Sequence, residues 1–250
     1  MSESPQKVKK TTSLLIVIAL YLAITITNEF LLLKGLALPL FSKGYILEHF
    51  WIRNYIHHFG QMILSLLVIA LLLKGHLKDY GLNVMNWSIS RKYILWFFLI
   101  YGAITLLNFL PNFLQRRPES VGFSLTSSNI LGWLSFQGLM SGTSEEIFFR
   151  GLLQTLLSKA WTGSVKIWKS LVPSAGLIAA VIFTFAHMEF AFDPFAVNYS
   201  VSQLVVAFIL GILYSVAYDR TKSLIAPILM HNYANLIMYC LGGLTVLLFA

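Results

Sequence analysis

Two carboxylates and a guanidinium stand close together in the stretch Ser144-Glu145-Glu146-Ile147-Phe148-Phe149-Arg150, inside an otherwise apolar segment. A charged side chain at the centre of a membrane helix costs about 2.5–3.5 kcal/mol on translocon scales. Three such side chains together therefore require mutual pairing, a water-filled cavity or both. This requirement makes the stretch the first candidate for a functional site.

Helical geometry separates the expected roles of the two glutamates. Glu146 and Arg150 are four residues apart with the acid N-terminal to the base, which is the favourable order for a pair on one helix face. Glu145 is rotated by about 100° from Glu146 and so points toward a different neighbour. We expect a structural Glu146–Arg150 pair and a Glu145 that is free for chemistry. The alternative is that both acids only pin helix packing through Arg150.

The composition is that of a polytopic membrane protein. The 250 residues are 57% hydrophobic and only 11% charged, and the mean hydropathy is +0.74. Several apolar runs approach the roughly 20 residues that cross a bilayer, and the breaks between them are short. The predicted fold class is therefore all-α, a transmembrane helical bundle of roughly seven spans with short interfacial or re-entrant helices. A separate soluble domain is excluded.

The expected spans follow one another along the whole chain. They cover residues 14–33, 59–73, 93–110, 130–157, 174–187, 201–217 and 224–241. The segment from 35 to 58 is rich in aromatic and charged residues, which indicates an interfacial or re-entrant segment with solvated histidines at His49, His57 and His58. A metal cluster of these three histidines is the less favoured interpretation.

The net charge of +8 is explained by topology rather than by nucleic acid. The Lys and Arg residues stand in short loops beside apolar runs, as the positive-inside rule expects, and no nucleic-acid partner is predicted. The rule places the N-terminus in the cytoplasm. The first apolar run has no small-residue cleavage site, so we expect an uncleaved first span. The single cysteine, Cys240, excludes an intrachain disulfide and a Cys-rich metal site.

Two further polar islands interrupt the later spans. His231 and Asn235 are four residues apart and project together from one helix, while Phe183 precedes His187 by the same interval and lies beside its imidazole. Together with Glu145, these islands indicate a shared cavity inside the bundle.

Amide hydrolysis is the chemistry that these groups predict. Glu145 would act as general base for a water molecule, with His187 holding the same water and passing a proton onward. His231 and Asn235 would donate to the oxyanion that develops on the scissile carbonyl. The competing use is a zinc site formed by Glu145, His187 and His231. The sequence lacks the His-Glu-x-x-His spacing typical of zinc, so no cofactor is assigned and zinc stays the alternative.

These residues resemble the CAAX-protease and bacteriocin-processing family (CPBP, Abi) of intramembrane endopeptidases, which includes type II CAAX prenyl endopeptidase. The family pattern is Glu-Glu-x-x-x-Arg, then Phe-x-x-x-His, then His-x-x-x-Asn. It is matched in order by Glu145, Glu146 and Arg150; by Phe183 and His187; and by His231 and Asn235. The resemblance covers about residues 130–241 and implies a helical membrane bundle with an internal site. It implies catalytic roles for Glu145, His187, His231 and Asn235, supported by Glu146, Arg150 and Phe183. Because the family has been described both as metalloproteases and as metal-independent, the resemblance leaves zinc open.

We therefore expect an intramembrane endopeptidase that cleaves a membrane-associated protein or peptide in a bacterial plasma membrane, with a role in bacteriocin self-immunity or peptide processing. Residues 1–128 would form N-terminal spans and the interfacial segment, and residues 129–250 the protease core of one continuous membrane domain. The alternatives are a non-enzymatic immunity or scaffold protein and a proton-coupled transporter. A serine protease built on Ser141 is disfavoured because no nucleophile–base pairing is evident. The substrate and the oligomeric state are not predicted.

Overall fold

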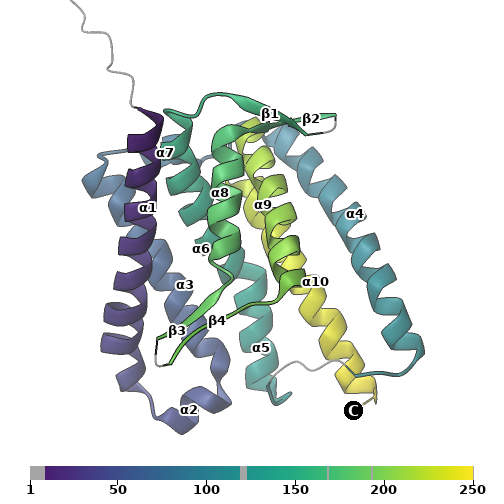
Figure 1. Cartoon of the computed structure of the whole chain (residues 1–250). Helices are drawn as coiled ribbons and strands as arrows, with labels where there is room; N and C mark the ends of the chain where they lie inside the picture. The colour runs from purple at the N-terminus through teal and green to yellow at the C-terminus, as the bar shows by residue number, and fades with distance from the viewer. Residues whose placement is uncertain (1–8, 119–122, 168, 193, 250) are drawn as a thin grey trace, which may run out of the picture.

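The computed structural model describes residues 9–118, 123–167, 169–192 and 194–249 and forms a mostly helical bundle (Figure 1). Within these residues, five helical stretches are long and apolar enough to cross a membrane: Lys10–Leu40, Phe50–Leu72, Trp87–Leu114, Val201–Thr221 and Ile225–Phe249. The predicted helical membrane class is confirmed, but the count of seven spans is not. The expected span at 130–157 is helical but carries the charged motif, and the one at 174–187 is a helix of only 12 residues, about 18 Å long.

The first half of the chain forms three long helical stretches joined by short turns. The elements are α1 (Lys10–Ile26), η1 (Thr27–Ala37), η2 (Leu38–Leu40), α2 (Lys43–Glu48), α3 (Phe50–Leu67), η3 (Val68–Leu72), η4 (Leu77–Tyr80) and α4 (Trp87–Leu114).

The second half begins with a helical rod built from five consecutive segments. These are α5 (Ser127–Ser135), η5 (Phe136–Ser141), α6 (Gly142–Glu146), η6 (Ile147–Gln154) and α7 (Thr155–Ser158). After them come β1 (Ser164–Ile167), β2 (Ser170–Pro173), α8 (Ser174–Phe185), β3 (Glu189–Phe192), β4 (Phe195–Asn198), α9 (Val201–Thr221) and α10 (Ile225–Phe249).

Local signals explain where several of these helices begin. The Thr126 hydroxyl accepts a hydrogen bond from the backbone N–H of Asn129 at 3.2 Å and so caps α5. Ser200 caps α9 in the same manner through Gln203. Pro173 lies in extended conformation directly before Ser174, the first residue of α8. The backbone N–H that proline lacks would have no partner within the helix at this position.

One boundary differs from the sequence expectation in a way that changes the site. The second long helix begins at Phe50 rather than at residue 59, because the chain turns at His49 and then continues in regular helix. His57 and His58 therefore lie inside α3, and the expectation that this segment keeps its histidines at a solvated interface is wrong for His58. The inward face of the same helix carries buried polar side chains at Gln61 and Ser65.

The rod from Ser127 to Ser158 lies in the middle of the bundle and supplies much of its core. Phe148, Leu152 and Leu153 are at most 1% exposed and pack in one cluster with side chains of α1, α3 and α8. The segments η5 and η6 have the wider turns of a π-helix, and α6, with both glutamates, stands between them. Such wide turns are frequent at functional sites.

The packing around α6 decides which side chains meet the motif. Helix α3 contacts α6 from one side and α10 contacts it from the other, while α8 packs against α9 and η6. Figure 1 shows α6 near the middle of the bundle height, surrounded by these helices. A side chain that points inward from α3, α8 or α10 can therefore approach the two glutamates.

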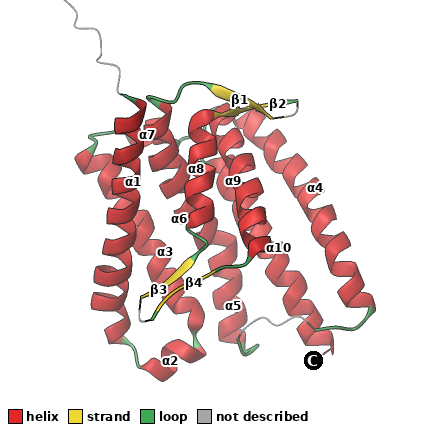
Figure 2. Cartoon of the chain, in the orientation of Figure 1, coloured by secondary structure: helices red, strands yellow, loops and turns green. Residues whose placement is uncertain are grey.

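The strands in the described residues form two antiparallel hairpins (Figure 2). In the first, β1 pairs with β2 from Ser164 opposite Pro173; in the second, β3 pairs with β4 from Glu189 opposite Asn198. The first hairpin covers one end of the bundle, and the second crosses its front below the middle in the view of Figure 1. The second hairpin begins two residues after His187, so α8 ends inside the bundle rather than at its far end.

Candidate active site

Glu146 and Arg150 form a fully buried ion pair, as the sequence predicted. The Arg150 Nη1 atom lies 2.9 Å from Glu146 Oε1, and both side chains are 0% exposed. Arg150 also donates through Nη2 to the carbonyl oxygen of Gly211 at 3.0 Å. Its guanidinium lies 4.5 Å from the centre of the Phe183 ring, a distance at which a cation is attracted to the ring face. These contacts join η6 to α8 and α9.

His231 of α10 contacts the same carboxylate. Its Nδ1 atom lies 2.8 Å from Glu146 Oε1. A carboxylate paired with Arg150 can only accept, so Nδ1 carries the hydrogen and donates it. The other ring nitrogen, Nε2, lies 3.8 Å from Glu145 Oε2. The imidazole is therefore oriented by Glu146 and presents its second nitrogen to Glu145.

Glu145 stands in a different environment from its neighbour. Its side chain is 17% exposed, with Oε1 at 3.8 Å from His58 Nδ1 and Oε2 at 3.8 Å from His231 Nε2. Both distances are too long for a direct hydrogen bond. The second distance is nevertheless short enough for one water molecule to contact both groups. No hydrogen bond from a described residue reaches this carboxylate, which leaves its lone pairs available.

His187 is held by the end of its own helix. Its Nδ1 atom lies 2.9 Å from the carbonyl oxygen of Phe183, and since a carbonyl only accepts, Nδ1 is the protonated nitrogen. Its Nε2 is then an acceptor. The Phe183 ring contacts both imidazoles edge to face, at 4.8 Å from His187 and 5.8 Å from His231. Phe183, expected as a supporting residue, thus links α8 to α10.

Asn235 lies one turn beyond His231 on α10 and faces the start of α6. Its Nδ2 atom donates to Ser141 Oγ at 3.1 Å. The four residues expected to be catalytic therefore fall into two groups: Glu145 and His231 face each other directly, whereas His187 and Asn235 reach the same region through Phe183 and Ser141.

Asn232 of α10, which no sequence motif singled out, contacts the beginning of α6. Its Oδ1 atom accepts a hydrogen bond from the backbone N–H of Gly142 at 2.8 Å. A Cβ atom on Gly142 would lie 2.5 Å from that oxygen and 2.8 Å from the Cβ of His231. Only glycine therefore lets α10 approach α6 this closely. The signal was present, since Asn232 stands beside His231 and Gly142 three residues before Glu145.

His58 is the second residue that the sequence analysis missed. Its Nδ1 atom lies 2.7 Å from Ser144 Oγ, and its ring meets Phe136 edge to face at 4.9 Å. The side chain is 13% exposed. A helical pattern could have revealed it, because His58, Gln61 and Ser65 follow the i, i+3, i+7 spacing of one face.

The neighbouring histidines point away from Glu145, although the His57 ring meets the His58 ring edge to face, with 5.5 Å between ring centres. His57 Nδ1 lies 3.4 Å from Glu29 Oε2 at the α1 side, and His49 contacts the carbonyl oxygen of Tyr45 at an exposed turn.

Among the described residues, no three His, Cys, Asp or Glu side chains are arranged to hold a metal ion. Glu145, His187 and His231 are thus not arranged as a zinc-binding set in this conformation. The metal-free mechanism stays a prediction, and zinc stays its alternative.

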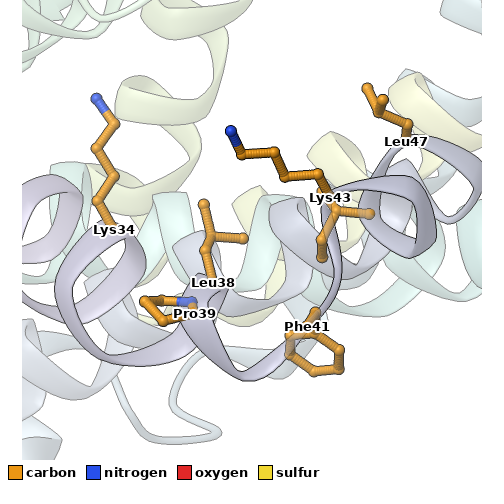
Figure 3. Close-up of a pocket in the computed structure, with 7 residues that line it drawn as sticks. Lys34, Leu38, Pro39, Phe41, Lys43 and Leu47 are labelled. Atoms are coloured by element: carbon orange, nitrogen blue, oxygen red, sulfur yellow. The ribbon is translucent and has the colours of Figure 1, made fainter.

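Two apolar grooves open on the face formed by η1, α2 and α3. The first, of about 510 Å³, is drawn in Figure 3 and is lined by Lys34, Leu38, Pro39, Phe41, Lys43, Ile46 and Leu47. The second, of about 540 Å³, lies between η1 and α3 and reaches Met140 of η5. Neither groove contains Glu145, but the second ends on the segment that leads directly into α6.

Comparison with known proteins covers the same part of the chain. Residues 127–237 match the family model described as type II CAAX prenyl endopeptidase Rce1-like. The matched range contains every expected site residue: Glu145, Glu146, Arg150, Phe183, His187, His231 and Asn235. No curated protein and no solved structure matches the chain.

Proposed function

Since residues 127–237 place this chain in the CAAX-protease family of intramembrane endopeptidases, as its motifs predicted, we propose that it hydrolyses a peptide bond with Glu145 as the base. The observation that carries the proposal is the contrast between adjacent carboxylates. Glu146 is neutralised by Arg150 at 2.9 Å, whereas Glu145 faces His231 Nε2 across 3.8 Å without a direct hydrogen bond. A carboxylate that is ionised, partly desolvated and unpaired is the form that can take a proton from water.

In the proposed reaction, Glu145 removes a proton as the water oxygen bonds to the scissile carbonyl carbon. The carbonyl electrons move onto its oxygen and form the oxyanion. Glu145 then returns the proton to the amide nitrogen, the oxyanion collapses and the C–N bond breaks. Protons and electrons balance without a cofactor. Because the nitrogen of His187 that is not bonded to Phe183 is an acceptor, it fits the task of orienting the attacking water.

His231 and Asn235 are the proposed donors to the oxyanion. The Nδ1–H of His231 is committed to Glu146, so His231 can donate only through Nε2, which requires the imidazolium form. Asn235 would release one amide N–H from Ser141 or use its second N–H. Loss of a single oxyanion donor typically lowers kcat by about 10²–10³-fold.

The short helix α8 supports water access to this site. With 12 residues, it spans about 18 Å of a hydrocarbon layer roughly 30 Å thick. Non-helical backbone at membrane depth is tolerated only where protein buries it or where it lines a water-filled cavity. We propose that the β3–β4 hairpin, which follows His187, lies at membrane depth, where a water-filled cavity beside it would supply the hydrolytic water.

The biological setting is part of the proposal. We propose a bacterial plasma membrane location with a cytoplasmic N-terminus, from the placement of Lys and Arg in the loops, and a role in bacteriocin self-immunity or peptide processing. A non-enzymatic scaffold would have no use for two imidazoles that are oriented by Glu146 and by a backbone carbonyl. This difference favours the enzyme over the scaffold.

The test is cleavage of a panel of membrane-associated peptides by purified wild type, Glu145→Gln and Glu146→Gln, with and without a zinc chelator. We expect wild type to cleave in both conditions and Glu145→Gln in neither, while the Glu146→Gln protein loses folded yield. Cleavage that the chelator abolishes and zinc restores would establish the metal alternative. Equal cleavage by Glu145→Gln and wild type would refute the mechanism.

A further inference from the structure

The geometry around α6 assigns a role to His58: we infer that it is a positioning residue that holds the Glu145 carboxylate in place opposite His231. This inference rests on the proposed function of Glu145, and it adds a residue from α3, outside the range that matches the family. Its basis is one hydrogen bond of 2.7 Å to Ser144 Oγ and the approach of its ring to within 3.8 Å of Glu145 Oε1.

The hydrogen bonds fix which His58 nitrogen carries the hydrogen. Ser144 Oγ donates to the backbone carbonyl oxygen of Ser141 at 3.0 Å, and a carbonyl can only accept, so the single hydroxyl hydrogen is committed there. Toward His58, Ser144 can therefore act only as an acceptor. His58 is accordingly the Nδ1–H tautomer, and its N–H edge is the part of the ring that approaches Glu145.

This edge acts on Glu145 without bonding to it. The Nδ1–H is directed to Ser144, so its positive end lies 3.8 Å from Glu145 Oε1 and attracts the carboxylate as a dipole. His231 stands at the same distance from the other carboxylate oxygen. The carboxylate thus lies between two imidazoles, each near one oxygen. Removal of one would free the side chain to rotate.

His58 is itself held rigidly. The Phe136 ring contacts the His58 ring edge to face, with 4.9 Å between ring centres. Ser144, to which His58 is hydrogen-bonded, belongs to the same helical turn as Glu145. The same region also holds the oxyanion side, since Asn235 donates to Ser141 Oγ at 3.1 Å. Ser141 therefore receives contacts from both the base side and the oxyanion side of the proposed site.

The kinetic test uses three substitutions at one position. His58→Ala should lower kcat by about 10–100-fold, because misplacement of a reacting group by about 1 Å can cost about 10²-fold, and leave KM unchanged. His58→Asn, whose side-chain N–H can reach Ser144, should recover much of the kcat. His58→Leu should restore packing against Phe136 but not kcat. His57→Ala is the matched control, because His57 is adjacent on α3 yet faces Glu29, and it should keep wild-type kcat.

A second measurement does not depend on activity. The measurement is the ¹⁵N NMR spectrum of the histidine rings in labelled protein in detergent. The resonances of His58 are those that disappear in His58→Asn, and they should show a protonated Nδ1 and an unprotonated Nε2. Ser144→Ala should change these resonances and leave those of His57 in place. A protonated Nε2 on neutral His58 would overturn the inference whether or not a substrate has been found.

The outcomes separate this inference from the proposed function. Cleavage that is lost in Glu145→Gln but unchanged in His58→Ala overturns only the role of His58. If His58→Leu recovers kcat and His58→Asn does not, His58 acts by packing against Phe136, and the positioning role is overturned. If wild type cleaves no peptide, the proposed function fails, and the ¹⁵N spectrum alone decides whether His58 has the inferred geometry.

Discussion

Glu145 and Glu146 are neighbours in the chain, yet their carboxylates differ in burial and in hydrogen bonding. Glu146 is 0% exposed and bonded to Arg150 and His231, while Glu145 is 17% exposed and has imidazoles only at 3.8 Å. The charge of Glu146 is compensated, so it fastens helices together. The charge of Glu145 is attracted but not bonded, so it can accept a proton. The two carboxylates thus differ in their contacts and not in residue type, and the proposed division of roles rests on that difference.

The largest effect should come from Glu145→Gln. The amide keeps the size and most of the packing of the side chain but cannot take a proton from water, so kcat should fall by about 10²–10⁴-fold. The measurement is peptide cleavage by detergent-solubilised protein, with thermal unfolding as the control for folding. A large drop in unfolding temperature would show that Glu145 is structural after all and would remove the contrast.

Arg150→Met tests the structural role of the Glu146–Arg150 pair. It leaves the buried Glu146 carboxylate without its guanidinium, and loss of one partner of a buried pair costs about 3–5 kcal/mol of unfolding free energy. Denaturant titration followed by circular dichroism would measure the loss. The double variant Glu146→Gln with Arg150→Met removes both charges and should recover part of the stability. If it recovers none, the loss comes from packing against Phe183 rather than from the stranded charge.

Gly142→Ala tests the close approach that brings His231 to both carboxylates. The new Cβ would lie 2.5 Å from Asn232 Oδ1 and 2.8 Å from the Cβ of His231, and overpacking of this kind costs about 1–3 kcal/mol. Cleavage should fall with stability because α10 must move away. Gly138→Ala is the control, since its Cβ would meet only Leu236 side-chain atoms at 3.7 Å. Equal effects of the two variants would contradict this account.

The smallest effect should come from Asp219→Asn at the end of α9. Asp219 pairs with Lys222 at 2.7 Å, closer than Glu146 to Arg150, but the two side chains are 36% and 62% exposed. Exposed pairs contribute about 0–1 kcal/mol to stability. The unfolding free energy should therefore stay within that range of wild type. A loss as large as that of Arg150→Met would mean that burial is not what gives the Glu146 pair its importance.

The sequence predicted those parts of the site that depend on local spacing. The Glu146–Arg150 pair follows from an i, i+4 interval on one helix, and the helical membrane class follows from composition. The structure also brings Glu145 and His231 together as the motif suggested. The catalytic roles themselves stay predictions, because no contact distance measures reactivity.

The missed features depend on packing between distant segments. His58 was expected at a solvated interface because Lys43, Glu48 and Arg53 precede it, yet α3 begins at Phe50 and turns His58 inward. The hydrogen bond from Gly142 to Asn232 joins residues 90 positions apart. Hydropathy also could not distinguish a full span from α8, whose apolar residues stop inside the bundle.

The wide turns of η5 and η6 make the geometry of the site depend on the type of helix on either side of α6. Their hydrogen bonds run from residue i to i+5, so each such turn holds a residue that an α-helix would not. If the residues of η5 formed α-helical turns without any change in chain length, each residue would advance by about 100° instead of the smaller step of the wider turn, and the segments on either side of η5 would rotate relative to each other. Glu145 would then turn away from His58 and His231 while all three sequence motifs stayed intact. The motifs would be complete in the sequence, but the site would not be assembled in space.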